Sequence, residues 1–390
     1  MNKKKKKVKT DAVENVVCYK AHLVAQGFSQ IPGIDYFDTF APVAKLASIC
    51  VVLAIATARN MEIHQIDIKG AYLNRKLTDD KQIYMWQPPD FGSSSHPHKV
   101  CLLKKTFYRL KQSSWQWYQY LCEILMDNLG FIWCDVNHSV FFKITLDPNG
   151  LIIILVHVNN CTLVSISLGL IDWVKNSVKE FVEIMDIGEI HWLLGVEVKR
   201  DREIGKIMLS QWSYIDASLH WFGLEDIKPV STPMDPAIHL TSNQLPKSTT
   251  EIACMTKIPY QEAIGILIYA ALGTRPDIAY TVQVLSKFSK DSGKAHWEAV
   301  KWVFQYLKGT KDLWLTYGGI GEKLVGFTNA DGNIAEDRCA TSGYAFIING
   351  GAISWSTKHQ EIVTLSTTES EYVSATHATK EALWLWLFIY

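Results

Sequence analysis

The chain has 390 residues, 48% of them hydrophobic, and its 39 basic side chains balance its 39 acidic ones. This length and apolar content exclude an intrinsically disordered chain and predict two or three domains with buried cores. The charge balance excludes a global field that would draw the chain to nucleic acid, so any basic groove must be local.

Neither cysteine nor lysine placement points to a secreted or membrane protein. The eight cysteines are scattered, without a Cys-x-x-Cys pair or a Cys/His metal spacing, which is typical of reduced cysteines in an intracellular protein. The lysine run at residues 3–9 is followed by no apolar segment of signal-peptide type, and no apolar run reaches membrane-spanning length. The run itself is open to three interpretations: a solvated tail, a nuclear-import signal or a phosphate-binding arm.

Four segments carry apolar residues at the spacing of an amphipathic helix. Within residues 48–59, for example, Ile49, Val52 and Ala56 fall on one stripe, because three to four residues make one helical turn. The same pattern predicts helices at residues 117–129, 170–181 and 295–309, the first ending at Gly130 and the last at Gly309.

A hairpin is predicted at residues 151–164. Residues 151–156 form an apolar run without polar alternation, which is typical of a strand buried on both faces. Asn159 and Asn160 favour a tight turn, because asparagine tolerates positive φ, and residues 161–164 would be the return strand. On this evidence alone the turn is either a plain connection or a site at the edge of a sheet.

The residues after the hairpin predict further strands and then a break. Residues 229–250 are rich in Pro, Ser and Thr and have no periodicity, which indicates a linker. The strands are expected at residues 185–199 and 207–211.

Five motifs resemble those of copia-type retrotransposon Pol polyproteins, and the resemblance covers nearly all of residues 8–390. Residues 19–46, which begin Tyr-Lys-Ala-His-Leu-Val-Ala-Gln-Gly-Phe, are similar to the family's fingers segment almost position for position. The hairpin tip resembles the Tyr-x-Asp-Asp turn of reverse transcriptases. The other three are Gln-Ile-Asp-Ile-Lys-Gly-Ala-Tyr-Leu-Asn at 65–74, Tyr-Arg-Leu-Lys-Gln at 108–112 and Glu-Ser-Glu-Tyr-Val at 369–373.

The resemblance implies an α+β fold with reverse-transcriptase fingers, palm and thumb, a helical connection and a truncated ribonuclease H-like α/β half-domain. In that half-domain we expect strands at residues 324–329, 343–348 and 353–356 and a helix at 368–387. Its apolar end at residues 383–390 predicts that the terminal region is the least stable and least soluble part of the chain. The implied divisions are a basic disordered lead-in at 1–18, reverse transcriptase at 19–235, linker and connection at 236–318, and the half-domain at 319–390.

The same resemblance implies two former metal sites. In the family, carboxylates hold two Mg²⁺ ions that activate the primer hydroxyl and neutralise the leaving pyrophosphate. It places the former polymerase site at Asp67, Asn159 and Asn160, and the former nuclease site at Asn329, Asp331 and Glu371. Asp67 and Glu371 are the metal-binding positions that keep a carboxylate, and the expected nucleotide or template contacts are Lys20, Lys111 and Gln112.

Departures from the family pattern bear on activity. An amide oxygen is a poor Mg²⁺ ligand beside a carboxylate, and a loss of about 4 kcal/mol of transition-state stabilisation slows a reaction about a thousandfold. The family pattern at residues 108–118 is Tyr-Gly-Leu-Lys-Gln-Ala-Pro-Arg-Gln-Trp-Tyr, so Arg109 replaces a glycine and Trp115 an arginine near the nucleotide. The sequence therefore predicts an RNA-directed DNA polymerase with ribonuclease H by descent, inactive in this copy, with RNA/DNA hybrid and dNTP as partners, in a cytoplasmic particle or the nucleus. The alternatives are a non-catalytic nucleic-acid-binding remnant and an untranslated pseudogene product.

Overall fold

The computed structural model describes residues 3–10, 16–77, 82–88, 91–146, 150–235, 237–319, 321, 323–331 and 338–390, with only the backbone described before residue 23. The chain divides into two compact units. The first contains Met1–Ala44 and Glu62–Glu189, and the second contains Lys45–Met61 and Ile190–Tyr390. Within the described residues, no helix is long and apolar enough to cross a membrane.

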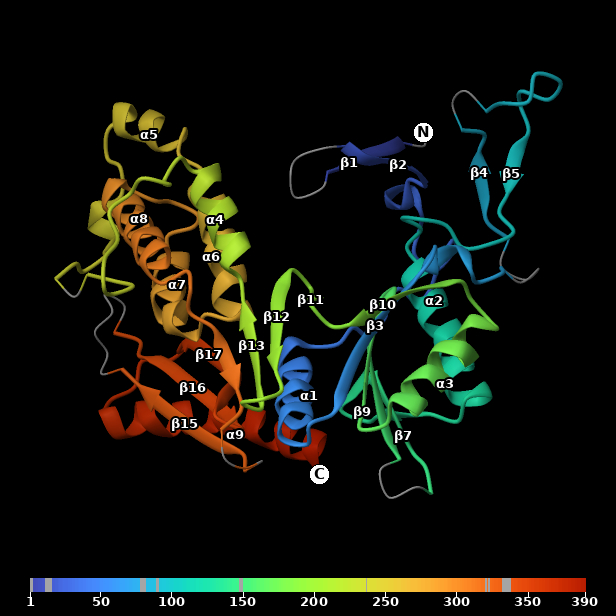
Figure 1. The fold of residues 1–390 in the computed structure, drawn as a ribbon. Coiled ribbons are helices and arrows are strands. Elements are labelled where there is room, and N and C mark those ends of the chain that lie inside the picture. The colour runs from blue at the N-terminus through green and yellow to red at the C-terminus, as the bar shows by residue number, and fades with distance from the viewer. Residues whose placement is uncertain are drawn as a thin grey trace. The chain divides into compact units, whose positions relative to one another are not determined.

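A six-stranded antiparallel sheet forms the centre of the first unit, in the order β10-β3-β9-β8-β7-β6 (Figure 1). The predicted hairpin is confirmed as β8 and β9, and every residue of β9 after its first is buried. The strands are β3 (Glu62–Ile68), β6 (Ile132–Cys134), β7 (Asn137–Ile144), β8 (Leu151–His157), β9 (Asn160–Ser165) and β10 (Ile184–Glu189).

Two helices pack on the same side of this sheet (Figure 1): α2 (Ser113–Cys122), which continues into a π-helical turn at Glu123–Asn128, and α3 (Leu168–Lys179). Their apolar stripes share one core with the sheet, as the helical spacing predicts. Trp117 of α2 is 2% exposed and Val174 of α3 is fully buried. Burying an aromatic or aliphatic side chain of this size contributes about 1.5–3 kcal/mol, so the core fixes the strands that carry the hairpin.

Two small strand pairs lie outside the central sheet. Strand β1 (Lys3–Thr10) pairs with β2 (Val16–Val24), which is followed by a 3-10 turn at Gly27–Ser29, and β4 (Tyr84–Trp86) pairs with β5 (Val100–Leu102). The lysine run thus lies in a paired strand, where the sequence predicts disorder, because its backbone groups find partners in β2.

The second unit contains a helical bundle and a four-stranded antiparallel sheet, β11-β12-β13-β14. Helices α4, α6, α7 and α8 share one apolar core, in which Phe304 of α8 is fully buried. Residues 229–250 have little regular structure but are attached to α8, since Trp302 Nε1 donates to the Thr232 carbonyl (2.8 Å). The bounds are α4 (Trp212–Trp221), α5 (Thr249–Met255), α6 (Tyr260–Gly273), α7 (Ala279–Ser286), α8 (Lys294–Gly309), β11 (Trp192–Leu193), β12 (Val196–Asp201), β13 (Lys206–Ser210) and β14 (Leu315–Tyr317).

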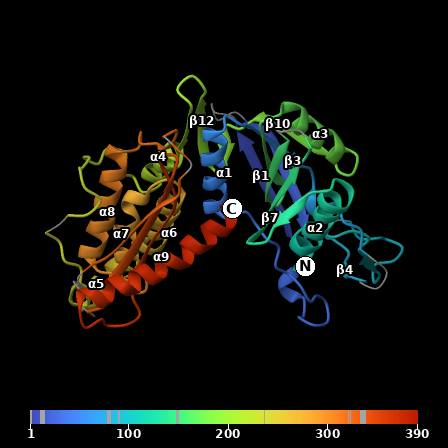
Figure 2. The ribbon, with the colours of Figure 1, turned by 90° about the horizontal axis from the view of Figure 1, so that it is seen from below.

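A three-stranded antiparallel sheet completes this unit, with β15 (Val325–Ala330), β16 (Thr341–Ile348) and β17 (Gly351–His359) in chain order. The long helix α9 (Thr367–Ile389; Figure 2) contacts β15 and β16, and its small residues Ser370, Ser374 and Ala378 are buried. The expected strands and helix are confirmed, with bounds that differ by up to three residues.

Helix α1 (Leu46–Ala58) also belongs to the second unit, where it contacts β13, β14, β16 and β17. Its predicted stripe is buried, but so are Cys50 and Val51, which lie off that stripe. The sequence predicts one buried face, whereas this helix is apolar all round and is covered on all sides.

Candidate functional site

The tip of the β8–β9 hairpin is held by three backbone contacts. His157 pairs with Asn160, so Val158 and Asn159 are the two turn residues. Trp117 Nε1 of α2 donates to the Val158 carbonyl (2.7 Å), and the Ile68 amide donates to the Asn159 carbonyl (2.7 Å). The residue that adopts positive φ is Val158 (+59°), whereas the sequence predicts a positive φ at the asparagines. A β-branched residue is disfavoured there, so the surrounding contacts hold a strained turn.

The three predicted polymerase-site residues meet at this tip. Asp67 lies on β3 directly opposite Asn160 on β9. The side-chain amide of Asn159 donates to Asp67 Oδ2 (2.5 Å). The side-chain oxygen of Asn160 is buried and has no hydrogen-bond partner among the described residues. Sequence reasoning therefore identified residues that are adjacent in space although Asp67 and Asn159 are 92 positions apart.

This donor set does not fit a pair of Mg²⁺ ions. It offers one carboxylate and two neutral amide oxygens, which are poor Mg²⁺ ligands beside a carboxylate, and the Asn159 amide turns its NH₂ group toward the carboxylate as a donor. No group of three His, Cys, Asp or Glu side chains in the described part of the chain is arranged to hold a metal ion. A single negative charge leaves the four positive charges of two Mg²⁺ ions largely uncompensated.

The surroundings of Asp67 favour neutral groups. Burial, and to a smaller extent the Asp67 charge, raise the pKa of the Cys161 thiol to about 12. Burial, Tyr72 and Asp67 likewise raise the pKa of Tyr108. Both side chains are therefore uncharged at neutral pH.

The predicted nucleotide and template residues lie in strand β2 and in the loop that precedes α2. Gln112 is 8% exposed and uses its amide internally, because it accepts from Gln30 Nε2 (3.0 Å) and donates to the Asp35 carbonyl (3.1 Å). Lys111 is exposed, and its backbone amide donates to Gln30 Oε1 (2.8 Å). Lys20 lies in β2 opposite Lys7, and its side chain is outside the described part. Gln112 thus joins two loops, while the Lys111 side chain is exposed to solvent.

The two replaced residues of this region differ in their consequences. Arg109 has φ +68°, so the backbone does require a left-handed conformation where the sequence comparison expects glycine. Trp115 stacks on Tyr118 (ring centroids 5.8 Å apart) and packs against the core of the first unit.

Trp117 is the residue that the helical pattern at residues 117–129 assigns to the core alone. Its helical spacing indicates burial, but nothing in that pattern indicates the hydrogen bond to the hairpin tip.

The predicted nuclease residues lie on neighbouring elements of the second unit. Asn329 is exposed on β15, and its carbonyl accepts from Ser374 Oγ of α9 (2.7 Å), one turn beyond Glu371. Asp331 follows β15; its amide donates to the Thr341 carbonyl (3.1 Å), and its carboxylate accepts from the Thr341 amide. The Asp331 carboxylate therefore holds the start of β16.

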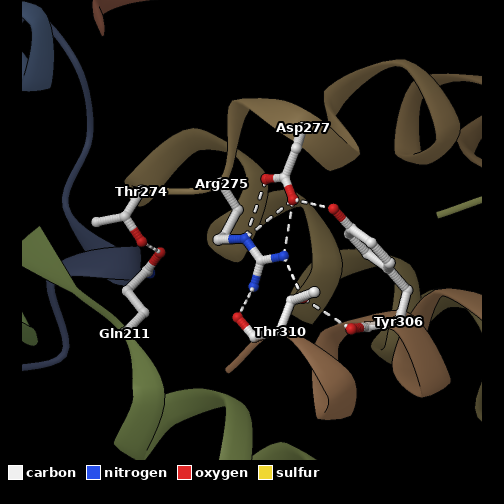
Figure 3. Close-up of polar contacts among 6 residues, drawn as sticks. All are labelled: Gln211, Thr274, Arg275, Asp277, Tyr306 and Thr310. Atoms are coloured by element: carbon white, nitrogen blue, oxygen red, sulfur yellow. Dashed lines mark hydrogen bonds and ion pairs between the residues drawn. The ribbon is translucent and has the colours of Figure 1, made fainter. Parts of the chain in front are cut away.

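A buried polar cluster in the second unit surrounds Arg275, which is 2% exposed (Figure 3). Arg275 donates through Nε and Nη2 to Asp277 (3.0 and 2.7 Å) and through Nη1 to the Thr310 carbonyl (3.2 Å). Tyr306 Oη also donates to Asp277 (2.8 Å). Burial acts to raise the pKa of Asp277, but the hydrogen bonds and charge of Arg275, with Tyr306, outweigh it and hold that pKa below its ordinary value. The cluster is internally satisfied, which indicates a structural role.

Comparison with known proteins gives one consistent result. The family model of reverse transcriptase (RNA-dependent DNA polymerase) matches residues 2–236. The chain is 40% identical, over 98% of its length, to the retrovirus-related Pol polyprotein from transposon TNT 1-94 of Nicotiana tabacum, and spans 29% of that protein. It is 35% identical, over 94% of its length, to the Pol polyprotein from transposon RE1 of Arabidopsis thaliana, and spans 24% of it. A putative transposon Ty5-1 protein of Saccharomyces cerevisiae is 30% identical over 81% of this chain and 100% of that protein.

Proposed function

The chain belongs to the reverse transcriptase family, in its copia-type transposon Pol branch, and we propose that it binds an RNA/DNA hybrid without supporting DNA synthesis. It spans less than a third of the two plant polyproteins, so this proposal concerns the segment alone. Its natural ligands would be the hybrid and an incoming dNTP, because those are the substrates of an RNA-dependent DNA polymerase.

The observation that carries the proposal is the hydrogen bond from Asn159 to Asp67. Two-metal phosphoryl transfer needs carboxylates that fix both cations at the attacking and leaving oxygens. Here Asp67 is the one carboxylate of the site, and one lone pair of its Oδ2 is already used by a neutral donor. If the missing charges remove about 4 kcal/mol of transition-state stabilisation, synthesis slows about a thousandfold. The packing that holds β3, β8 and β9 in register does not need a metal, so binding can survive the loss of chemistry.

The finer architecture is part of the same proposal. Residues 19–235 would be fingers, palm and thumb, residues 236–318 the connection, and residues 319–390 a ribonuclease H-like half-domain. Support for the palm comes from an antiparallel sheet with the Asp67 strand beside the hairpin strand. Support for the half-domain comes from three antiparallel strands followed by the long helix α9. With Asn329 in place of a carboxylate, we expect no hybrid cleavage.

Primer extension on poly(rA)·oligo(dT), with Mg²⁺ or Mn²⁺, tests the proposal. We expect the chain to bind the hybrid with an affinity that falls steeply with salt, and to extend no primer. The variant Asn159→Asp/Asn160→Asp is the gain-of-function comparison, and Asp67→Asn is the matched negative control. Extension by the unaltered chain within about tenfold of the double variant, a barrier difference of about 1.4 kcal/mol, would show that the amides do not limit catalysis.

A further inference from the structure

The two-stranded ribbon of β4 and β5 exposes an apolar face. On β4, Tyr84 is 59% and Trp86 69% exposed; on β5, Val100 is 43% and Leu102 37% exposed. Tyr84 pairs with Leu102 and Trp86 with Val100. Because successive residues of a strand alternate between its two sides, these four residues share one side, which we call the ribbon face. Neither strand contains a charged residue.

The ribbon stands apart from the central sheet of the first unit (Figure 1). Within the described residues, β4 and β5 contact mainly each other. The arm that carries them is joined backbone to backbone, since the Leu103 amide donates to the Ile83 carbonyl (2.9 Å) and the Thr106 amide to the Arg75 carbonyl (3.0 Å). A two-stranded ribbon alone is only marginally stable in water. An apolar surface that covers the ribbon face would therefore stabilise it.

Gln87 holds residues 93–99 against the end of β4. Its Nε2 donates to the carbonyl oxygens of His96 (2.8 Å) and Lys99 (2.6 Å), and its Oε1 accepts from the Ser93 amide. These contacts exist before any partner binds. The ribbon face is therefore preorganised, which lowers the entropic cost of association.

The chemistry of the ribbon face favours a protein partner over nucleic acid. Contacts to phosphate come mainly from lysine and arginine, and neither strand has one. Exposed strands commonly carry lysine or proline, which discourage association, and these two strands carry neither. An exposed apolar patch of this kind marks a contact between proteins.

A second copy of the ribbon face is a complementary partner. Aromatic residues occupy β4, and smaller aliphatic residues occupy the positions directly opposite on β5. When two such faces meet across a two-fold axis parallel to the strands, β4 of each copy lies over β5 of the other, so large side chains meet small ones. Two aromatic side chains bury about 150–250 Å² each, which is roughly half of the ~800 Å² per partner in a standard interface. The expected dimer is therefore weak and reversible.

We propose that the ribbon face is a self-association site through which two copies of this chain form a two-fold symmetric dimer. Trp86 of each copy packs on Val100 of the partner subunit, and Tyr84 on Leu102 of the partner subunit. The contact uses neither Asp67 nor the hairpin tip. The dimer therefore forms without nucleic acid, and the inference does not depend on the proposed function.

Sedimentation velocity of the full chain without nucleic acid tests this proposal. We expect a reversible monomer–dimer equilibrium with a dissociation constant of about 10–100 μM, as is usual for small interfaces. Trp86→Glu places a charge in the contact and should weaken association about thirtyfold or more. Trp221→Glu changes a tryptophan that is 70% exposed on α4, so it is the matched control and should associate as the unaltered chain does. Circular dichroism checks that both variants fold.

A pair of charge variants tests how the two faces meet. Trp86→Glu and Val100→Lys should each be monomeric alone, and a mixture of the two should associate again, because the new carboxylate of one copy would lie over the new ammonium group of the other. A mixture that stays monomeric would overturn the packing of aromatic residues over aliphatic ones.

Three further outcomes would overturn the self-association itself. The first is an unaltered chain that remains monomeric at about 200 μM, well above the expected dissociation constant. The second is a Trp86→Glu protein that dimerises as strongly as the unaltered chain. The third is a monomeric chain whose affinity for the RNA/DNA hybrid falls in Trp86→Glu but not in Trp221→Glu, which would make nucleic acid the ligand of the ribbon face.

Discussion

Asn159 donates its side-chain amide to Asp67 at a nitrogen–oxygen distance of 2.5 Å. The contact joins the hairpin tip to β3. The donor is a neutral amide and the acceptor is a carboxylate, so the contact forms without any cation.

Restoring the carboxylates should restore a dependence on Mg²⁺. In Asn159→Asp/Asn160→Asp, like charges beside Asp67 lower the melting temperature when no metal is present. Mg²⁺ at about a hundred times its dissociation constant raises the free energy of unfolding of this variant by about 2.7 kcal/mol. Thermal melting with and without Mg²⁺ measures both effects. The exposed Asn176→Asp serves as the control. An equal Mg²⁺ response in the unaltered chain would contradict our interpretation of the site.

Replacing Arg109 by glycine should stabilise the fold. Glycine adopts φ +68° without a Cβ clash, so we expect the free energy of unfolding to rise by about 0.5–1 kcal/mol in urea denaturation. Lys111→Gly, two residues away and without positive φ, should lower it by a similar amount through backbone entropy. A destabilised Arg109→Gly protein would mean that the side chain contributes more to folding than its exposure indicates.

The Arg275–Asp277 pair should make stability sensitive to acid. Arg275 holds the pKa of Asp277 below its ordinary value in the folded chain. The contribution of ionised Asp277 to the free energy of unfolding is therefore complete above about pH 3.9, the pKa of an unfolded aspartate. It is lost as the pH falls through the lower pKa of the folded chain. Urea denaturation between neutral and acidic pH measures this loss, and Asp277→Asn should remove it. An unchanged pH profile in Asp277→Asn would mean that other carboxylates cause the acid response.

Arg275→Met should lower the free energy of unfolding by about 2 kcal/mol at neutral pH. This is less than for a fully buried pair, because the Asp277 side chain is 32% exposed. The lost bonds to Thr310 add to the cost. Arg275→Lys keeps the charge but not the planar fork, so it should recover only part of the loss. Full recovery by lysine would show that charge alone matters at this position.

Truncation after Gly318 tests whether the terminal region limits the solubility of the chain or protects it from aggregation. The apolar end of the chain predicts a gain in solubility, but the contacts of β17 and of the turn before it reverse that expectation. Trp355 Nε1 donates to the Ala271 carbonyl of α6 (2.9 Å), and Asn349 Nδ2 donates to the Ala54 carbonyl of α1 (3.1 Å). Removing residues 319–390 would uncover α1, which is buried nearly all round. Size-exclusion chromatography of the shortened chain should therefore show aggregation, and a monodisperse product would refute this view.

The sequence by itself determined the local elements and the family. Helical spacing and the apolar run at residues 151–156 depend on neighbours a few positions apart, so α2, α3, α8 and the β8–β9 hairpin follow from the pattern alone. The motifs also named Asp67, Asn159 and Asn160, because an amide in place of a carboxylate can be recognised without coordinates.

Only the tertiary structure decided how those residues meet. The register that sets Asp67 opposite Asn160, and the indole of Trp117 on the Val158 carbonyl, both join segments that are distant in the sequence. Such pairings depend on how whole elements pack, which no local periodicity encodes. The same packing forces positive φ onto Val158 and Arg109, residues whose own preferences oppose it, because the contacts around each turn together outweigh the local strain.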